Sequence, residues 1–142
     1  MNTDLLFQFS NIWVIPGWIL LWFFPGRSWT YPVVTYLIIL LLGLIYAILL
    51  FGSQVPFDPE AFSSLDGIKS MFGNDRLLLA GWIHYLAFDL TAGLFITKDA
   101  LRIGYPVWLR IPVLFFVFMT GPLGMLIYLM TRLIYSKSAR WS

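Results

Sequence analysis

The 142-residue sequence contains no cysteine, one histidine and only 16 charged residues, nine Lys or Arg and seven Asp or Glu. Without cysteine there is no disulfide framework, thiolate nucleophile or cysteine-ligated metal. A single histidine cannot build a multi-histidine metal site. The net charge of +2 comes from scattered residues and not from a basic stripe. We therefore expect no metal centre and no nucleic-acid partner.

Long apolar runs dominate the sequence, in which 60% of the residues are hydrophobic. Four runs of 20 or 21 residues lie at 5–24, 32–51, 77–97 and 111–131. A helix of that length rises roughly 30 Å, the thickness of the hydrocarbon core of a bilayer. The runs lack the alternation of barrel strands. We predict an all-α membrane protein, a four-transmembrane-helix bundle in a single domain over residues 1–142.

The longest polar stretch, residues 52–76, separates the second predicted span from the third. Within it, apolar residues recur at helical spacing: Phe62, Leu65, Ile68, Met71 and Phe72. This pattern predicts a short amphipathic helix on the membrane surface. Four spans place this stretch and the C-terminus on the same side of the membrane. That side then has five Lys and Arg residues, and the opposite side has four. The charges therefore set no orientation, and the sequence predicts no removable signal peptide at its start.

The third span carries the candidate chemistry, because Asp89 is the one charged residue inside the four runs. An Asp at the centre of a spanning helix costs about 2.5 to 3.5 kcal/mol on insertion scales and is normally paired, protonated or turned inward. His84 lies in the same span, about 140° away around the helix. Burial raises the pKa of a carboxylic acid and lowers that of a histidine, so both values move toward neutral pH, which suits acid–base chemistry.

A structural interpretation stands beside the chemical one. In it, Asp89 accepts a hydrogen bond from Tyr85, Asn11 or Tyr46, and His84 donates to a backbone carbonyl freed by a proline. Helix-breaking prolines occur in the first and fourth spans, at Pro16 and Pro122. The residues alone favour neither interpretation.

Several segments together resemble the abscisic-acid-deficient-4-like family, which includes plant neoxanthin synthesis proteins. The segments are GWIHYLAFDL at residues 81–90, Asp99, GPLG at residues 121–124, IPGW at residues 15–18, and Pro25. They occur in order over nearly the whole chain. The spacing of Trp82, His84 and Asp89 within the first segment is the most specific part of the resemblance.

The resemblance implies a function in carotenoid chemistry. Plant members are needed to convert violaxanthin, an epoxide-bearing carotenoid, to neoxanthin, and this isomerisation needs an acid and a base but no redox cofactor. His84 and Asp89 are then the catalytic candidates. Trp82, Tyr85, Asn11 and Trp18 are the candidates for ligand contact. A carotenoid is about as long as the hydrocarbon core is thick, so its epoxide must tilt or slide to reach residues near the midplane.

Other functions remain open at this point. The alternative to an enzyme is a non-catalytic protein that binds pigment or supports a membrane assembly. A third class, a proton-linked transporter using Asp89, would need oligomerisation to build a pathway. We expect membrane lipids and a carotenoid or other isoprenoid as partners, and homo-oligomerisation is left open. The predicted location is a bacterial cell membrane or a thylakoid-type membrane.

Overall fold

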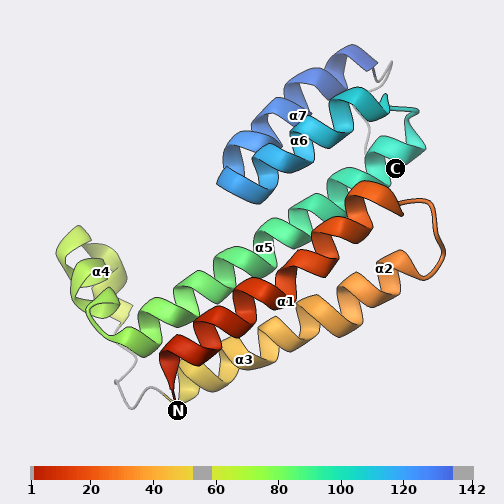
Figure 1. The fold of residues 1–142 in the computed structure, drawn as a ribbon. Coiled ribbons are helices and arrows are strands. Elements are labelled where there is room, and N and C mark those ends of the chain that lie inside the picture. The colour runs from red at the N-terminus through yellow and green to blue at the C-terminus, as the bar shows by residue number, and fades with distance from the viewer. Residues whose placement is uncertain (1, 53–58, 136–142) are drawn as a thin grey trace.

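The computed structural model describes residues 2–52 and 59–135, and every regular element in these ranges is a helix (Figure 1). In chain order the elements are α1 (Thr3–Phe23), α2 (Thr30–Pro32), the π-helix η1 (Val33–Ile39), α3 (Leu40–Phe51), the 3₁₀-helix η2 (Pro59–Ser63), α4 (Leu65–Phe72), α5 (Asp75–Arg102), α6 (Val107–Thr120) and α7 (Pro122–Tyr135). The prediction of an all-helical chain is thus confirmed for the described residues.

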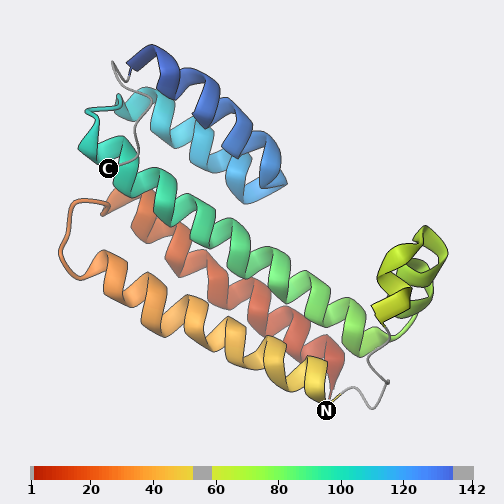
Figure 2. The same ribbon diagram turned by 180° about the vertical axis from the view of Figure 1, so that it is seen from behind.

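Three long helical segments form the body of the molecule: α1, the continuous segment Thr30–Phe51 made of α2, η1 and α3, and α5. The α1 and α5 helices run in the same direction, and Thr30–Phe51 runs against them (Figures 1 and 2). Each of the three is long and apolar enough to cross a membrane. They coincide with the first three predicted spans, and α5 extends beyond the predicted run 77–97 at both ends.

Side-chain caps begin two of these helices. The Asn2 side chain accepts hydrogen bonds from two backbone N–H groups of the first turn of α1, at 3.0 and 3.2 Å. Asn74 does the same for α5, at 3.0 and 3.3 Å. These bonds satisfy backbone donors that a helix start leaves free.

Small residues let the long helices approach closely. A Cβ on Gly93 of α5 would lie 2.7 Å from the indole of Trp18 on α1, and a Cβ on Gly17 would lie 2.7 Å from Leu90. Trp18 and Leu90 are both fully enclosed in the core. The bulk of one helix therefore fits against a glycine of the other, as is usual between membrane helices.

The region of the predicted fourth span folds differently, so the prediction of one continuous helix over residues 111–131 is wrong. Here α6 and α7 lie side by side and antiparallel, as a helical hairpin (Figures 1 and 2). Gly121 makes the turn with φ 47° and ψ −88°, a conformation open to glycine. Pro122 does not kink a helix but is the first residue of α7, where its missing N–H costs nothing.

The two helices of the hairpin are short and tightly packed. Each has 14 residues, a length of about 21 Å against a hydrocarbon core of about 30 Å. A Cβ on Gly124 would collide with the backbone nitrogen of Val117, so the helices touch near the turn. Neither helix alone is long enough to cross a bilayer.

The hairpin returns to the end of the bundle where α5 finishes. The ring of Tyr135, at the end of α7, lies 5.3 Å from that of Tyr105, which follows α5. At the other end of the bundle, Arg76 donates to the carbonyl of Gly52 at 2.6 Å. Hence α7 ends at the opposite end of the bundle from α4, contrary to the expectation from four spans.

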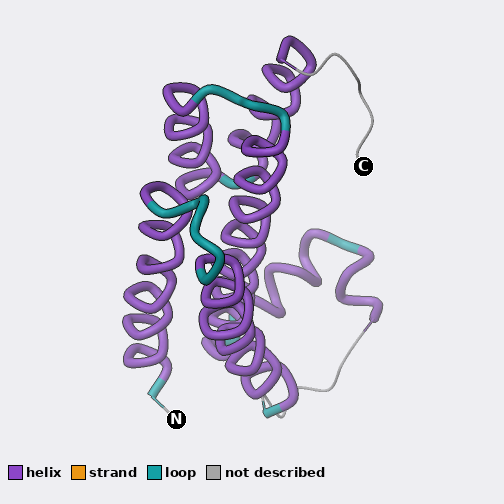
Figure 3. The backbone as a smooth tube through the Cα atoms, turned by 90° about the vertical axis from the view of Figure 1, so that its right-hand side faces the viewer, coloured by secondary structure: helices purple, strands orange, loops and turns teal. Residues whose placement is uncertain are grey.

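A helix does form within the predicted amphipathic stretch. The α4 helix begins after Ser64, whose hydroxyl accepts from the backbone N–H of Gly67 at 3.1 Å, and it projects from the long helices (Figure 3). Its Phe72 ring would lie 3.1 Å from a Cβ on Gly81 of α5, while Leu65 is 70% exposed. Its location on a membrane surface stays a prediction.

Candidate functional site

Asp89 lies at the turn of the hairpin. It is close to the midpoint of α5, and its side chain is 8% exposed. A Cβ on Gly121 would overlap the Asp89 carboxylate, so this glycine is needed both for the conformation of the turn and for the space above the acid. The hairpin therefore covers Asp89 with backbone and not with a side chain.

One oxygen of this carboxylate has no partner. No described donor hydrogen-bonds to the buried Oδ2 of Asp89. The Tyr85 phenol lies close enough to influence the ionisation of Asp89, but its one proton is donated to the carbonyl of Met119 at 3.1 Å. A buried oxygen without a donor is costly, so the site lacks a proton, a donor or a ligand group.

Three of the four predicted ligand contacts come together beside the hairpin turn. The Trp82 indole stacks on Tyr85 with ring centroids 5.4 Å apart, and its Nε1 donates to Oδ1 of Asn11 at 2.9 Å. Phe7 of α1 adds a third ring, 5.8 Å from Trp82. We call Phe7, Asn11, Trp82 and Tyr85 the aromatic patch. Trp82 is 39% exposed and Phe7 44%, so the patch is open to a ligand.

Trp18, the fourth predicted contact, belongs to the core. It is 2% exposed, and its ring lies 5.4 Å from that of Phe118 on α6. Its indole also fills the space beside Gly93. Trp18 therefore helps to seat α6 against α1 and α5, and it does not face the open patch.

His84 and Asp89 are not brought together. His84 is exposed on the side of α5 that faces α3, with its ring 4.3 Å from that of Phe88 and 5.7 Å from that of Tyr46. Of the three donors that the structural interpretation offered to Asp89, Asn11 accepts from Trp82 and Tyr46 contacts His84. Tyr85 alone lies beside the carboxylate, and its hydroxyl donates to the Met119 carbonyl. The wide separation expected around the helix accounts for this arrangement.

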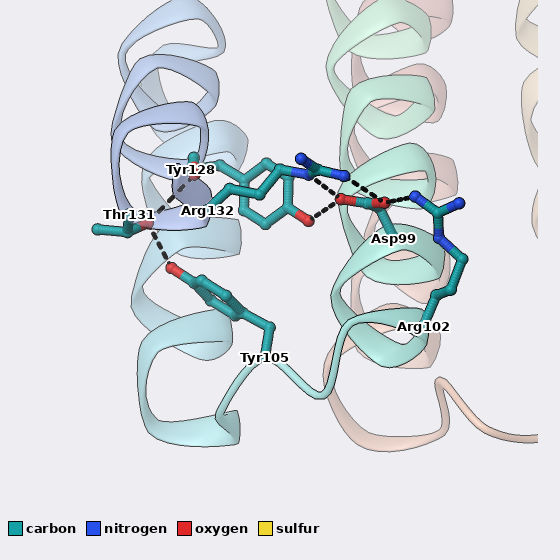
Figure 4. A network of polar contacts seen from close by, with 6 residues as sticks. All are labelled: Asp99, Arg102, Tyr105, Tyr128, Thr131 and Arg132. Atoms are coloured by element: carbon teal, nitrogen blue, oxygen red, sulfur yellow. Dashed lines mark hydrogen bonds and ion pairs between the residues drawn. The ribbon is translucent and has the colours of Figure 1, made fainter. Parts of the chain in front are cut away.

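A second aspartate, Asp99, holds the base of the hairpin (Figure 4). Its Oδ2 accepts from the Tyr128 hydroxyl at 2.6 Å and from Arg132 Nε at 2.5 Å. Its Oδ1 accepts from Arg102 at 2.5 Å and from Arg132 Nη2 at 3.3 Å. Asp99, Tyr128 and Arg132 are all buried, so the network of these four residues ties α7 to α5. We call it the base clamp.

Tyr105 and Thr131 extend the base clamp toward the connection between α5 and α6. Their hydroxyl oxygens lie 2.6 Å apart, and burial raises the pKa of the Tyr105 phenol. The phenol therefore remains a hydrogen-bond donor at neutral pH.

Sequence reasoning singled out Asp99 only through the family resemblance, and it missed Tyr128 and Arg132. Arg132 directly follows the last apolar run, where an Arg is expected to reach the interface. The sequence carried no signal for the pairing of Arg132 with Asp99. In a single continuous span over residues 111–131, the two side chains would lie too far apart to meet.

The described residues offer no metal site of the usual kind. No group of three or more His, Cys, Asp or Glu side chains lies together in residues 2–52 and 59–135. The chemistry available at the hairpin turn is that of one carboxylate, one phenol and the aromatic patch.

Comparison with known proteins gives one match. The family model described as ABA4-like, ABA DEFICIENT 4-like, matches residues 5–128. This match covers more than half of the chain and includes both Asp89 and Asp99. No curated protein and no solved structure matches the chain.

Proposed function

Because the chain belongs to the ABA DEFICIENT 4-like family, we propose that it is an integral membrane protein that binds a carotenoid or similar isoprenoid lipid at the aromatic patch. We further propose that it isomerises an epoxide-bearing carotenoid there. The observation that carries the proposal is the buried, unpartnered Oδ2 of Asp89 beside Tyr85 and the turn of the hairpin.

The aromatic patch suits a flat, apolar ligand. The stacked rings of Trp82 and Tyr85 present a surface on which a conjugated chain can lie. The hairpin stops at Gly121, so the N-terminal half of α5 on this side is not covered by α6 or α7 (Figures 1 and 2). A ligand lying obliquely along α1 and α5 brings its end ring to Asp89 and answers the objection that an upright carotenoid keeps its epoxide near the interface.

Asp89 and Tyr85 supply the base and acid for the isomerisation. The Asp89 carboxylate takes the proton from the terminal polyene carbon that is bonded to the epoxide ring, and the electron pair of that C–H bond forms a second double bond from this carbon to the epoxide carbon, which makes the allene. The epoxide C–O bond breaks, and its oxygen takes the proton of the Tyr85 phenol. Asp89 then returns its proton to Tyr85, so no electron is gained or lost and no redox cofactor is needed.

His84 has no part in this step, because it lies on the other side of α5. The sequence-based pairing of His84 with Asp89 is therefore replaced by a pairing of Tyr85 with Asp89. The same separation favours a second candidate function, non-catalytic pigment binding, in which the aromatic patch holds the ligand and Asp89 accepts a hydrogen bond from a ligand hydroxyl.

The test uses the purified full chain in lipid nanodiscs with violaxanthin as the probe. Visible absorption measures binding, and chromatography measures conversion. We expect Asp89→Asn and Tyr85→Phe to bind the carotenoid while losing conversion by about a hundredfold or more. Tyr36→Phe, which removes a hydroxyl from a tyrosine that is 73% exposed on the second helical segment, is the matched control and keeps full conversion, as does His84→Gln.

The outcomes separate the two candidates. Binding without conversion by the unmodified chain supports the pigment-binding function. If the chain neither binds nor converts the carotenoid, both are wrong. If it converts and Asp89→Asn converts equally well, the reaction occurs elsewhere in the molecule.

A further inference from the structure

A second group of unsatisfied polar atoms lies away from Asp89, where α6 begins. Arg110, in the first turns of α6, is 4% exposed, and its Nε has no hydrogen-bond partner among the described residues. The hydroxyl of Tyr31, at the start of the second helical segment, is also buried without a partner. A buried guanidinium N–H and a buried phenol hydroxyl without partners are both costly.

Three elements bring cationic and hydroxyl groups together here. The Lys98 ammonium of α5 lies 4.8 Å from the centroid of the Tyr31 ring, and Tyr31 and Arg110 are within electrostatic reach of each other. Lys98 is exposed, so this group is open on one side. It combines a planar guanidinium, an ammonium and a phenol hydroxyl, all of which donate hydrogen bonds.

No described carboxylate neutralises these charges. Asp99, one residue after Lys98, is engaged by Arg102, Arg132 and Tyr128. No ion pair of Lys98 or Arg110 occurs among the described residues. The positive charge of Arg110 is therefore buried without a counter-charge from residues 2–52 or 59–135.

The surroundings place this group near the membrane surface. Trp29 is 48% exposed and Trp108 is 69% exposed, and both belong to the same end of the bundle as Arg110. Exposed tryptophans at the ends of spanning helices mark the level of the lipid headgroups. A phosphate at that level meets the three donors and supplies the missing negative charge.

We propose that Arg110, Tyr31 and Lys98 bind a phosphate group, whether it belongs to an anionic membrane lipid or is free in solution. Arg110 binds the phosphate oxygens from within the fold, Lys98 binds them from the open side, and the Tyr31 hydroxyl donates between them. This site is separate from the proposed carotenoid reaction, and neither Arg110 nor Lys98 has a part in that reaction.

The test measures thermal unfolding of the detergent-purified chain while phosphatidylglycerol, phosphatidylcholine or inorganic phosphate is added. We expect saturable stabilisation by phosphatidylglycerol or by inorganic phosphate, and phosphatidylcholine is the zwitterionic comparison. The half-saturating concentration should rise about tenfold in Arg110→Gln, which loses a charged hydrogen bond. It should rise about fivefold in Lys98→Gln, which loses one charge near the headgroups.

Arg27→Gln is the matched control, because Arg27 is an exposed cation in the loop between α1 and α2. It should leave the half-saturating concentration unchanged. Stabilisation by the lipid alone identifies a headgroup site, and stabilisation by inorganic phosphate identifies a site for a soluble anion. The proposal is overturned if neither stabilises the chain, or if Arg27→Gln weakens the effect as much as Lys98→Gln. Should Arg110→Gln fail to fold, Lys98→Gln and Tyr31→Phe decide the matter.

Discussion

Asp89 and Asp99 lie on the same helix, are 8% and 5% exposed, and are both contacted by the α6–α7 hairpin. Their surroundings nevertheless differ completely. Asp99 accepts four hydrogen bonds from three residues, whereas Oδ2 of Asp89 accepts none. Burial of an acid therefore does not reveal its role, and the supply of donors does.

The difference divides the hairpin into two working parts. The base clamp fixes α7 to α5 through Tyr128 and Arg132 of α7, and Arg102 of α5 binds the same carboxylate. The turn only covers Asp89 with the backbone of Gly121. A fully paired carboxylate holds structure in place, and an unpaired one is ready to exchange a proton or accept a ligand.

The largest expected effect concerns the side of the membrane on which the hairpin ends. If residues 111–131 crossed the bilayer, the hairpin would not exist and could not contact both Asp89 and Asp99. The chain has no cysteine, so single cysteines can be introduced at exposed Ser28, Ser70 and Ile134. In sealed vesicles, an impermeant maleimide should label positions 28 and 134 from one side and position 70 from the other. Permeabilised vesicles provide the control for reactivity. Labelling of positions 70 and 134 from the same side would restore the four-span arrangement.

Asp99→Asn should be the most destabilising of the matched aspartate substitutions. It leaves Arg132, which is 2% exposed, without its buried counter-charge, at an expected cost of about 3 to 5 kcal/mol. Thermal or denaturant unfolding in detergent measures the loss. Arg102→Gln is the control, because its side chain is 38% exposed and its removal should cost below about 1 kcal/mol. Equal losses in the two variants would show that the clamp does not depend on the buried arginine.

Gly121→Ala should disturb the turn of the hairpin. The φ of 47° strains any side chain, and the added Cβ overlaps the Asp89 carboxylate, so we expect a cost of about 2 to 4 kcal/mol. Gly104→Ala is a close control, because Gly104 also has a positive φ, 67°, but no neighbour within 4 Å. It should cost about 1 to 2 kcal/mol. The difference between the two losses of unfolding free energy measures the contribution of the contact with Asp89. Equal losses in the two variants would contradict a close contact between the turn and Asp89.

Asp89→Asn should have the smallest effect on stability. No described donor loses its bond to Oδ2, so the unfolding free energy should change by less than about 1 kcal/mol. Asp89→Ala should behave similarly, which separates Asp89 from Asp99 under the same unfolding assay. A loss in Asp89→Asn as large as that in Asp99→Asn would mean that Asp89 also holds the fold together.

The sequence predicted the three long helices because each apolar run is of spanning length and predominantly apolar. It could not distinguish a fourth span from the hairpin, because the same apolar residues suit lipid in either arrangement. The dipeptide Gly121-Pro122 was the informative signal, but it predicts a kink as readily as a turn. The distinction depends on Arg132 and Asp99, which lie far apart in sequence and pair only after α7 folds back.

The candidate site was predicted in part for similar reasons. Trp82 and Tyr85 share a face with Asp89 through helical spacing alone, so their proximity follows from the sequence. Trp18 was chosen by resemblance, and only the tertiary contact with Gly93 shows that it is buried. Oδ2 of Asp89 lacks a donor because the Tyr85 hydroxyl donates its hydrogen bond to the carbonyl of Met119. Met119 belongs to the hairpin, so this arrangement could not be predicted from α5 alone.

The return of α7 to the end of α5 also bears on how the chain enters a bilayer during synthesis. A helix pair that begins and ends on the same side has no flanking polar segment to carry across the membrane. The cations at its base, Arg110 and Arg132, therefore stay on the side where the connection after α5 emerged. The Asp99–Arg132 ion pair requires α7 to lie against α5, so it secures the hairpin only when both helices are in place.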